Sequence, residues 1–355
     1  MDSVLPSDAT AVNRNLSQIE VVIPEPVHLP DVEDIRFLAL SCDELTLAVG
    51  TAAEVVLVDM RVLARAAPGS TVGVVGRVAV GAAVVEMEWN TGKFPDLLAV
   101  VSADEQLVLV RADGELAGSG SVAGVLSVSW SPKGSKLACG LSNGSITTHS
   151  VPALTVSGAG IPAPPASEAD LAGCVPVSLS WIHNTQWAVW YGAAEAPHHG
   201  GGMAVVSRHG GEASFMELDV APTRPSEKRG VRAQFELLRP WLLMAVATSA
   251  SKDIDLAQQD SADEPWKLLL LNEGAEAAIP LSLKNRKETY NLGTAWYTSP
   301  KVYHAKCPTD YTELPPPLPV LLTLTTDGAM VVHGLHAARP EELERVAEVM
   351  TVRQS

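Results

Sequence analysis

Basic residues are scarce in this chain of 355 residues, which holds 25 Lys and Arg against 41 Asp and Glu, a formal net charge of −16. Proteins that bind nucleic acid directly place clustered Lys and Arg against the phosphate backbone. The charge balance therefore argues against a direct nucleic-acid binder. A basic surface on another protein is the better complement to an acidic chain.

Cysteine is equally scarce, with four residues, Cys42, Cys139, Cys174 and Cys307, scattered along the sequence. No two of them are close enough in sequence to form a Cys-x-x-Cys zinc or redox motif. The spacing also argues against a disulfide framework of the kind that stabilises small secreted domains. A reducing compartment is the expected environment.

Long apolar runs are missing too. No stretch of about 18 uninterrupted apolar residues occurs, and no early basic segment leads into an apolar run. We therefore predict neither a signal peptide nor insertion into a membrane.

Catalytic and metal-binding patterns are also absent. There is no Gly-x-Ser-x-Gly motif, and the pair His198-His199 has only Glu195 as a carboxylate close in sequence. A plain glycine-rich loop explains this pair better than a metal site does. We predict no enzyme, no cofactor and no metal.

What the chain does contain is a repeated short strand that ends in Trp, at Trp89, Trp130, Trp181 and Trp296. A degenerate copy lies at residues 37–41. A period of roughly 40 to 50 residues made of short strands is typical of a β-propeller. Because each repeat needs the same large apolar anchor against its neighbour, we interpret these Trp residues as packing residues rather than ligand-binding ones.

About six such units are visible in an all-β, WD40-like pattern. Their candidate strands lie at residues 35–40, 45–49 and 54–59; 84–89, 97–101 and 106–110; 126–130, 136–140 and 145–149; 177–181, 187–191 and 203–207; 231–238, 242–248, 253–257 and 266–271; 291–297, 320–325 and 329–333. Continuous apolarity in the middle strands predicts burial on both faces.

Three segments are expected: an N-terminal lead-in at residues 1–30, a β-propeller at 31–335 and a helix at 336–355. In the last segment Leu343, Val346, Ala347 and Met350 share one helical face, and Pro340 with adjacent acids suits a first turn.

Four segments together resemble the N-terminal propeller of the large cytoplasmic-filament FG nucleoporin (CAN type). They are Leu-Ala-Leu-Ser-Cys-Asp-Glu-Leu-Thr-Leu at residues 38–47, Val-Leu-Ser-Val-Ser-Trp-Ser-Pro-Lys-Gly at 125–134, Ala-Thr-Ser-Ala-Ser-Lys-Asp-Ile at 247–254, and the stretch from Pro-Pro-Pro-Leu-Pro-Val-Leu to Thr-Thr-Asp-Gly at 315–328. The Trp-Ser-Pro element alone is shared with many WD40-like proteins. The matches keep chain order from about residue 20 to about residue 335.

This resemblance implies a seven-bladed propeller at the cytoplasmic face of the nuclear pore complex. It further implies docking of the DEAD-box RNA helicase of mRNA export, whose basic surface would face an acidic propeller surface, beside other nucleoporins of the cytoplasmic filament. Glu168 and Asp170 lie at the position in this chain that matches the family's acidic, helicase-facing loop. Arg339 and Arg345 lie where the family has basic residues beyond its last blade, although their spacing differs.

Two departures from the family pattern stand out. The family has a complete blade before the segment that matches residues 20–47, where this chain has a short tail; either the first blade is lost or the sequence is truncated. The family also continues into coiled coils and Phe-Gly repeats, whereas no Phe here precedes Gly.

Two other interpretations remain open at this point. One is an unrelated WD40-like interaction scaffold, such as a coat or signalling adaptor. The other is a propeller hydrolase, which would need clustered carboxylates or a metal at the central channel.

Overall fold

The computed structural model describes residues 27–67, 69–118, 120–197, 199, 201–220, 231–261, 264–269, 277–282, 285–297 and 319–334. They belong to two compact units, one within Val22–Asp219 and the other within Val220–Ser355. The predicted helix at 336–355 and most of the predicted lead-in segment lie outside the described residues. The predicted domain bounds stay a prediction.

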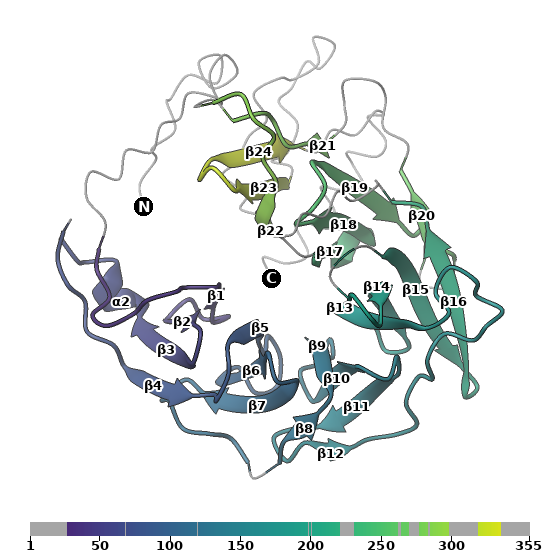
Figure 1. Ribbon diagram of the computed structural model, residues 1–355, viewed down its shortest axis with the longest axis horizontal. Helices are drawn as coiled ribbons and strands as arrows, with labels where there is room; N and C mark the ends of the chain where they lie inside the picture. Colours follow the sequence, from purple (N-terminus) through teal and green to yellow (C-terminus); the bar gives the residue numbers. More distant parts are fainter. Residues whose placement is uncertain are drawn as a thin grey trace. The chain divides into compact units, whose positions relative to one another are not determined.

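The first unit contains four antiparallel sheets of four strands each, and in every sheet the strands pair in chain order (Figure 1). They are β1 Phe37–Leu40, β2 Thr46–Gly50, β3 Glu54–Asp59 and β4 Gly76–Ala79; β5 Val84–Trp89, β6 Leu97–Ser102, β7 Gln106–Arg111 and β8 Val122–Ala123; β9 Val125–Trp130, β10 Lys136–Leu141, β11 Ile146–Ser150 and β12 Thr155–Val156; β13 Cys174–His183, β14 Gln186–Ala193, β15 Gly202–His209 and β16 Glu212–Leu218. A four-residue helix, α2 Met60–Leu63, lies between β3 and β4.

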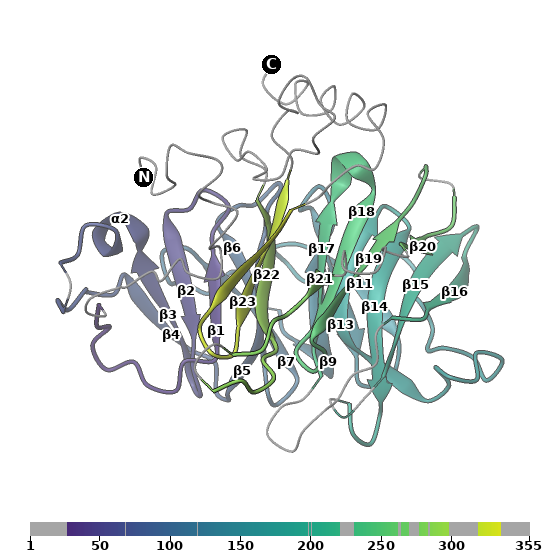
Figure 2. The ribbon, with the colours of Figure 1, turned by 90° about the horizontal axis from the view of Figure 1, so that it is seen from above.

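The second unit contains two further antiparallel sheets among the described residues. One holds β17 Ala233–Leu238, β18 Leu243–Thr248, β19 Asp253–Gln258 and β20 Lys267–Leu268, with β21 Ala277–Ala278 also paired to β19; the other holds β22 Asn291–Tyr297, β23 Val320–Thr325 and β24 Met330–Gly334. Figure 2 shows β22, β23 and β24 running side by side, as their antiparallel pairing requires.

The middle strands are buried on both faces, as their continuous apolarity predicts. All six residues of β6 are buried, and so are all six of β18. Alternate side chains of β6 enter two different cores: Leu98 and Val100 pack with the first sheet, whereas Leu97 and Val101 pack with the third. Strand β6 therefore joins the sheet before its own to the sheet after it.

Three of the four Trp residues at the ends of the inner strands join successive sheets by a repeated hydrogen bond, and the fourth, Trp181, packs in the core between the third and fourth sheets. The indole N–H of Trp89 donates to the carbonyl of Ala39 at 3.0 Å, and that of Trp130 donates to the carbonyl of Glu88 at 2.9 Å. In the second unit Trp296 donates to the carbonyl of Glu236 at 2.8 Å. The interpretation of these residues as packing anchors is confirmed.

Tight hairpins close the strand pairs through a recurring side-chain turn. The hydroxyl of Ser41 donates to Asp43, and the hydroxyl of Thr325 donates to Asp327, each at 2.6 Å. In both turns the same carboxylate oxygen also accepts the backbone N–H two residues further on. Asp is favoured in such turns because its short side chain can bond to its own backbone.

The fourth strand of each sheet in the first unit and helix α2 were not among the predicted elements. The predicted strand at 266–271 is described only as the two-residue β20. No helix within the described ranges is long and apolar enough to cross a membrane.

Candidate protein-interaction surface

A turn between β12 and β13 presents the two carboxylates that the sequence singles out. The backbone carbonyl of Glu168 accepts from the N–H of Leu171 at 3.0 Å and of Ala172 at 2.8 Å, while the N–H of Glu168 donates to Pro165 at 3.0 Å. The side chain of Leu171 is 1% exposed and packs in the core of the fourth sheet. This buried anchor holds the turn against the sheet.

Ile161 fixes the start of the same loop. It exchanges both backbone hydrogen bonds with Ile146 on β11, at 2.7 and 2.9 Å, and its side chain is 2% exposed. The loop is thereby fastened to the third sheet at one end and to the fourth at the other. Glu168 is left half-buried and Asp170 exposed.

A third carboxylate, Glu217 on β16, lies near these two although it is distant in sequence. Partial loss of hydration raises the pKa of the exposed Glu217 carboxyl above its usual value, and the negative charges of Asp170 and Glu168 raise it further. Like charges disfavour each other's ionised form only when they are close in space. Glu168 and Asp170 therefore lie near enough to Glu217 for their charges to act on it, and we call these three carboxylates the acidic surface.

Glu217 was not predicted from the sequence, because no local sequence pattern singles it out. The signal would have been the pairing of β15 with β16, in which Glu217 lies opposite Ala204 at the edge of the fourth sheet. That pairing follows from a strand that was not predicted.

The acidic surface suits a cationic protein partner better than a metal. Within the part of the chain that the structure describes, no three His, Cys, Asp or Glu side chains are grouped closely enough to hold a metal ion. Carboxylates spread over a surface instead attract Arg and Lys from another protein and guide their approach.

The remaining predicted site residues, Arg339 and Arg345, lie outside the described residues, as does His198. The role of the two arginines in partner binding stays a prediction.

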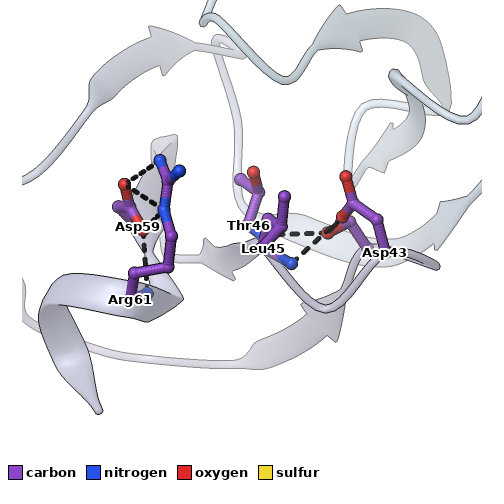
Figure 3. Close-up of polar contacts among 6 residues, drawn as sticks. Asp43, Leu45, Thr46, Asp59 and Arg61 are labelled. Atoms are coloured by element: carbon purple, nitrogen blue, oxygen red, sulfur yellow. Dashed lines mark hydrogen bonds and ion pairs between the residues drawn. The ribbon is translucent and has the colours of Figure 1, made fainter. Parts of the chain in front are cut away.

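A second charged site lies on the first sheet, where Arg61 folds back over Asp59 (Figure 3). The guanidinium donates to both carboxylate oxygens, with Nη2 2.6 Å from Oδ2, and the backbone N–H of Arg61 donates to Oδ1 at 2.8 Å. These bonds, first of all those from the Arg61 side chain, lower the pKa of Asp59 to about 2. Nearby Asp43 has a lowered pKa because it accepts from Ser41 and from the backbone of Leu45.

Comparison with known proteins identifies the family of the chain. The sequence matches the NUP159/214 beta propeller family over residues 14–330. It is 27% identical over 315 residues to the nuclear pore complex protein Nup214 of Homo sapiens, a match that covers 83% of this chain and 14% of that protein. The chain thus spans a small part of this relative.

Solved structures show the same fold at low sequence identity. The N-terminal domain of Nup159 matches with a TM-score of 0.63 and 15% identity, over 86% of this chain and 77% of that chain. A structure of S. cerevisiae Dbp5 bound to Nup159, Gle1, IP6 and ADP matches with a TM-score of 0.63 and 16% identity, over the same shares of 86% and 77%. The WD40 domain of Toxoplasma gondii coronin matches with a TM-score of 0.53 and 14% identity, over 84% of this chain and 68% of that one.

The Trp-anchored sheets, the match along most of the chain and the shared fold agree with one another. The chain therefore belongs to the NUP159/214 β-propeller family, a family of all-β, WD40-like nucleoporin propellers that act as scaffolds and not as enzymes.

Proposed function

We propose that this chain is a docking domain for the DEAD-box RNA helicase of mRNA export, at the cytoplasmic face of the nuclear pore complex. The observation that carries the proposal is the acidic surface, in which Glu168 and Asp170 lie on a turn anchored to two sheets and their charges act on Glu217 of β16. A structural match whose description has Dbp5 bound to Nup159 supports a helicase as the partner class.

The proposed mechanism is electrostatic capture. A helicase surface that binds RNA phosphates carries Lys and Arg, and three neighbouring carboxylates would compete for those cations. The mutual repulsion among the carboxylates, seen in the raised pKa of Glu217, would be relieved when a cation approached. Such complementarity chiefly speeds and orients docking.

Arg339 and Arg345 are proposed as additional contacts, on the strength of their position beyond the last sheet. Other nucleoporins of the cytoplasmic filament are proposed neighbours of the whole protein. Direct contact with nucleic acid or insertion into a membrane is not part of the proposal, because the net charge of −16 disfavours the first and no apolar run supports the second.

The test is a pull-down of the purified helicase on immobilised chain, at low and high salt. We expect the double variant Glu168→Lys and Asp170→Lys to lose most of the bound helicase, because two attractive charges become repulsive.

The matched control is Glu33→Lys with Glu115→Lys, which changes the net charge equally at two exposed positions of other sheets. Retention of helicase by the control, with unchanged circular dichroism in both variants, supports docking at this surface. Equal loss in both variants, or salt-insensitive binding by the wild type, would refute it.

A further inference from the structure

An open groove of about 650 Å³ lies beside helix α2 on the first sheet. One wall is formed by α2 and the turn after it, and the other by the segment 70–73. Its lining residues are Asp59, Arg61, Val62, Arg65, Ala66, Ser70, Thr71, Val72 and Gly73. All of them belong to the first unit.

The charge in this groove is positive, in contrast to the chain as a whole. Asp59 is the only acid among the lining residues, and it is already neutralised by Arg61, which donates to both of its oxygens. Arg65 is exposed, and no ion pair joins it to any described residue. One guanidinium is thus left for a ligand.

The segment 70–73 has the geometry of a strand with one free edge. On one side the N–H of His28 donates to the carbonyl of Ser70 at 2.9 Å, and the N–H of Val72 donates to the carbonyl of His28 at 2.9 Å. In a strand bonded through residues 70 and 72, the N–H and carbonyl of Thr71 point to the opposite side. They have no backbone partner among the described residues.

Side chains along the segment alternate as in a strand, with Val72 3% exposed and Thr71 and Gly73 exposed. Across the groove, the side chain of Val62 on α2 is also open to solvent, with 51% of the residue exposed. The groove therefore combines an unpaired backbone edge, an exposed apolar side chain and an unpaired cation.

We propose that this groove binds an extended acidic peptide of another protein. The peptide would add as a strand to the free edge at Thr71 and Gly73, since backbone pairing is the usual source of affinity in strand addition. One of its carboxylates would pair with Arg65, and an apolar residue would cover Val62. This ligand is opposite in charge to the cationic partner of the acidic surface, so the two sites would select different partners.

Gly73 offers a way to block the groove without disturbing the sheet. A Cβ built at Gly73 meets nothing within 4 Å, and the residue has no positive φ that would exclude other side chains. The variant Gly73→Trp should therefore fold and fill the groove. Arg65→Glu reverses the unpaired charge, and Lys133→Glu is the matched control, because Lys133 is exposed on the third sheet's hairpin and undergoes the same charge change.

The probe is a fluorescein-labelled octapeptide of alternating Glu and Val, acetylated and amidated at its ends, followed by fluorescence anisotropy. We expect saturable binding to the wild type, weakened about tenfold or more by Gly73→Trp and by Arg65→Glu and unchanged by Lys133→Glu. An octapeptide of alternating Lys and Val should not bind.

Three results would overturn the proposal: no saturable binding of the Glu-Val peptide at millimolar concentration, equal binding by the Lys-Val peptide, or undiminished binding by Gly73→Trp. Thermal unfolding checks that each variant is folded. If Gly73→Trp is not, Gly73→Leu serves as a smaller block under the same criteria.

Discussion

Trp89, Trp130 and Trp296 each end an inner strand and donate one hydrogen bond to a carbonyl of the preceding sheet. Trp130 is 4% exposed, lies in the core between the second and third sheets, and donates to the carbonyl of Glu88. The first inner strand ends differently: Leu40 pairs with Leu47 on β2 as Trp130 pairs with Leu137 on β10. Leu40 is 45% exposed and carries no donor that could make the equivalent bond.

Truncating Trp130 should therefore cost much of the stability of the sheet array. We expect Trp130→Ala to lower the free energy of unfolding by about 3–5 kcal/mol, because a large buried side chain is removed and a cavity remains. Trp130→Phe should cost about 1–3 kcal/mol, because the carbonyl of Glu88 loses its buried donor. Urea unfolding measures both.

The control for this prediction is Leu38→Ala, at a position that is 65% exposed. It should change the free energy of unfolding by no more than about 0.5 kcal/mol. Equal effects of Leu38→Ala and Trp130→Ala would contradict the packing role of Trp130.

The pKa of Glu217 depends on the charges of the other two carboxylates of the acidic surface. Its pKa is raised by partial loss of hydration and by the charges of Asp170 and Glu168. Replacing these two with Glu168→Gln and Asp170→Asn should move the pKa of Glu217 back toward its usual value, since only the charges are removed. Carbon-13 NMR titration of the Glu217 carboxyl measures the change.

The same titration in the Glu33→Gln variant is the control, because Glu33 does not contribute to the raised pKa of Glu217. A pKa of Glu217 that is identical in the double variant and the wild type would show that the three carboxylates do not form one surface.

At the scale of elements, the sequence predicted the inner strands well and the outer strands poorly. The predicted bounds of β3, β5, β22 and β23 match the structure, because apolar runs mark β3 and β23 and the repeated Trp marks β5 and β22. The outer strands β8 and β12 have two residues each, and β16 alternates exposed and half-buried residues. An edge strand buries little, so little hydrophobic pattern marks it.

The sequence singled out two of the three carboxylates of the acidic surface. Glu168 and Asp170 were found through a resemblance that fixed their place in the loop before an inner strand. Glu217 was not found, because its contribution depends on β16 pairing with β15, a long-range contact that no local pattern encodes. Helix α2 was not predicted, because four residues are too few to show helical periodicity.

Helix α2 depends on Asp59, which accepts the backbone N–H of Arg61 at the helix start and pairs with its guanidinium. The pKa of Asp59 falls from its ordinary value of 3.8 to about 2. A lowered pKa means that the ionised carboxylate contributes stability above pH 3.8 and that this contribution disappears as the pH falls through 2.

Asp59→Ala should therefore lower the thermal midpoint at neutral pH, and the difference from the wild type should vanish near pH 2. Asp59→Asn should lose less at neutral pH, because Asn still caps a helix although it lacks the charge. Thermal unfolding between pH 2 and pH 7 measures these differences. A deficit of Asp59→Ala that stayed constant down to pH 2 would contradict the ion pair.

The whole molecule is an acidic chain that carries two local surfaces of opposite charge. Glu168 and Asp170 lie on a loop whose backbone is fastened by the buried Leu171 and Ile161, and Glu217 lies on strand β16, so the backbone that carries the acidic surface is in place before a partner arrives. A preformed surface loses less conformational entropy on binding. This is the property expected of a docking domain that acts by position and charge.

The central claim is that the acidic surface docks the mRNA-export helicase, and the most direct test is its affinity measured by calorimetry over a series of salt concentrations. The wild type should bind with an affinity that falls steeply as salt rises. Glu168→Lys with Asp170→Lys should bind about tenfold or more weakly at low salt and show a flatter salt dependence, because fewer charge contacts are made. The same affinity and the same slope in both proteins would contradict the claim.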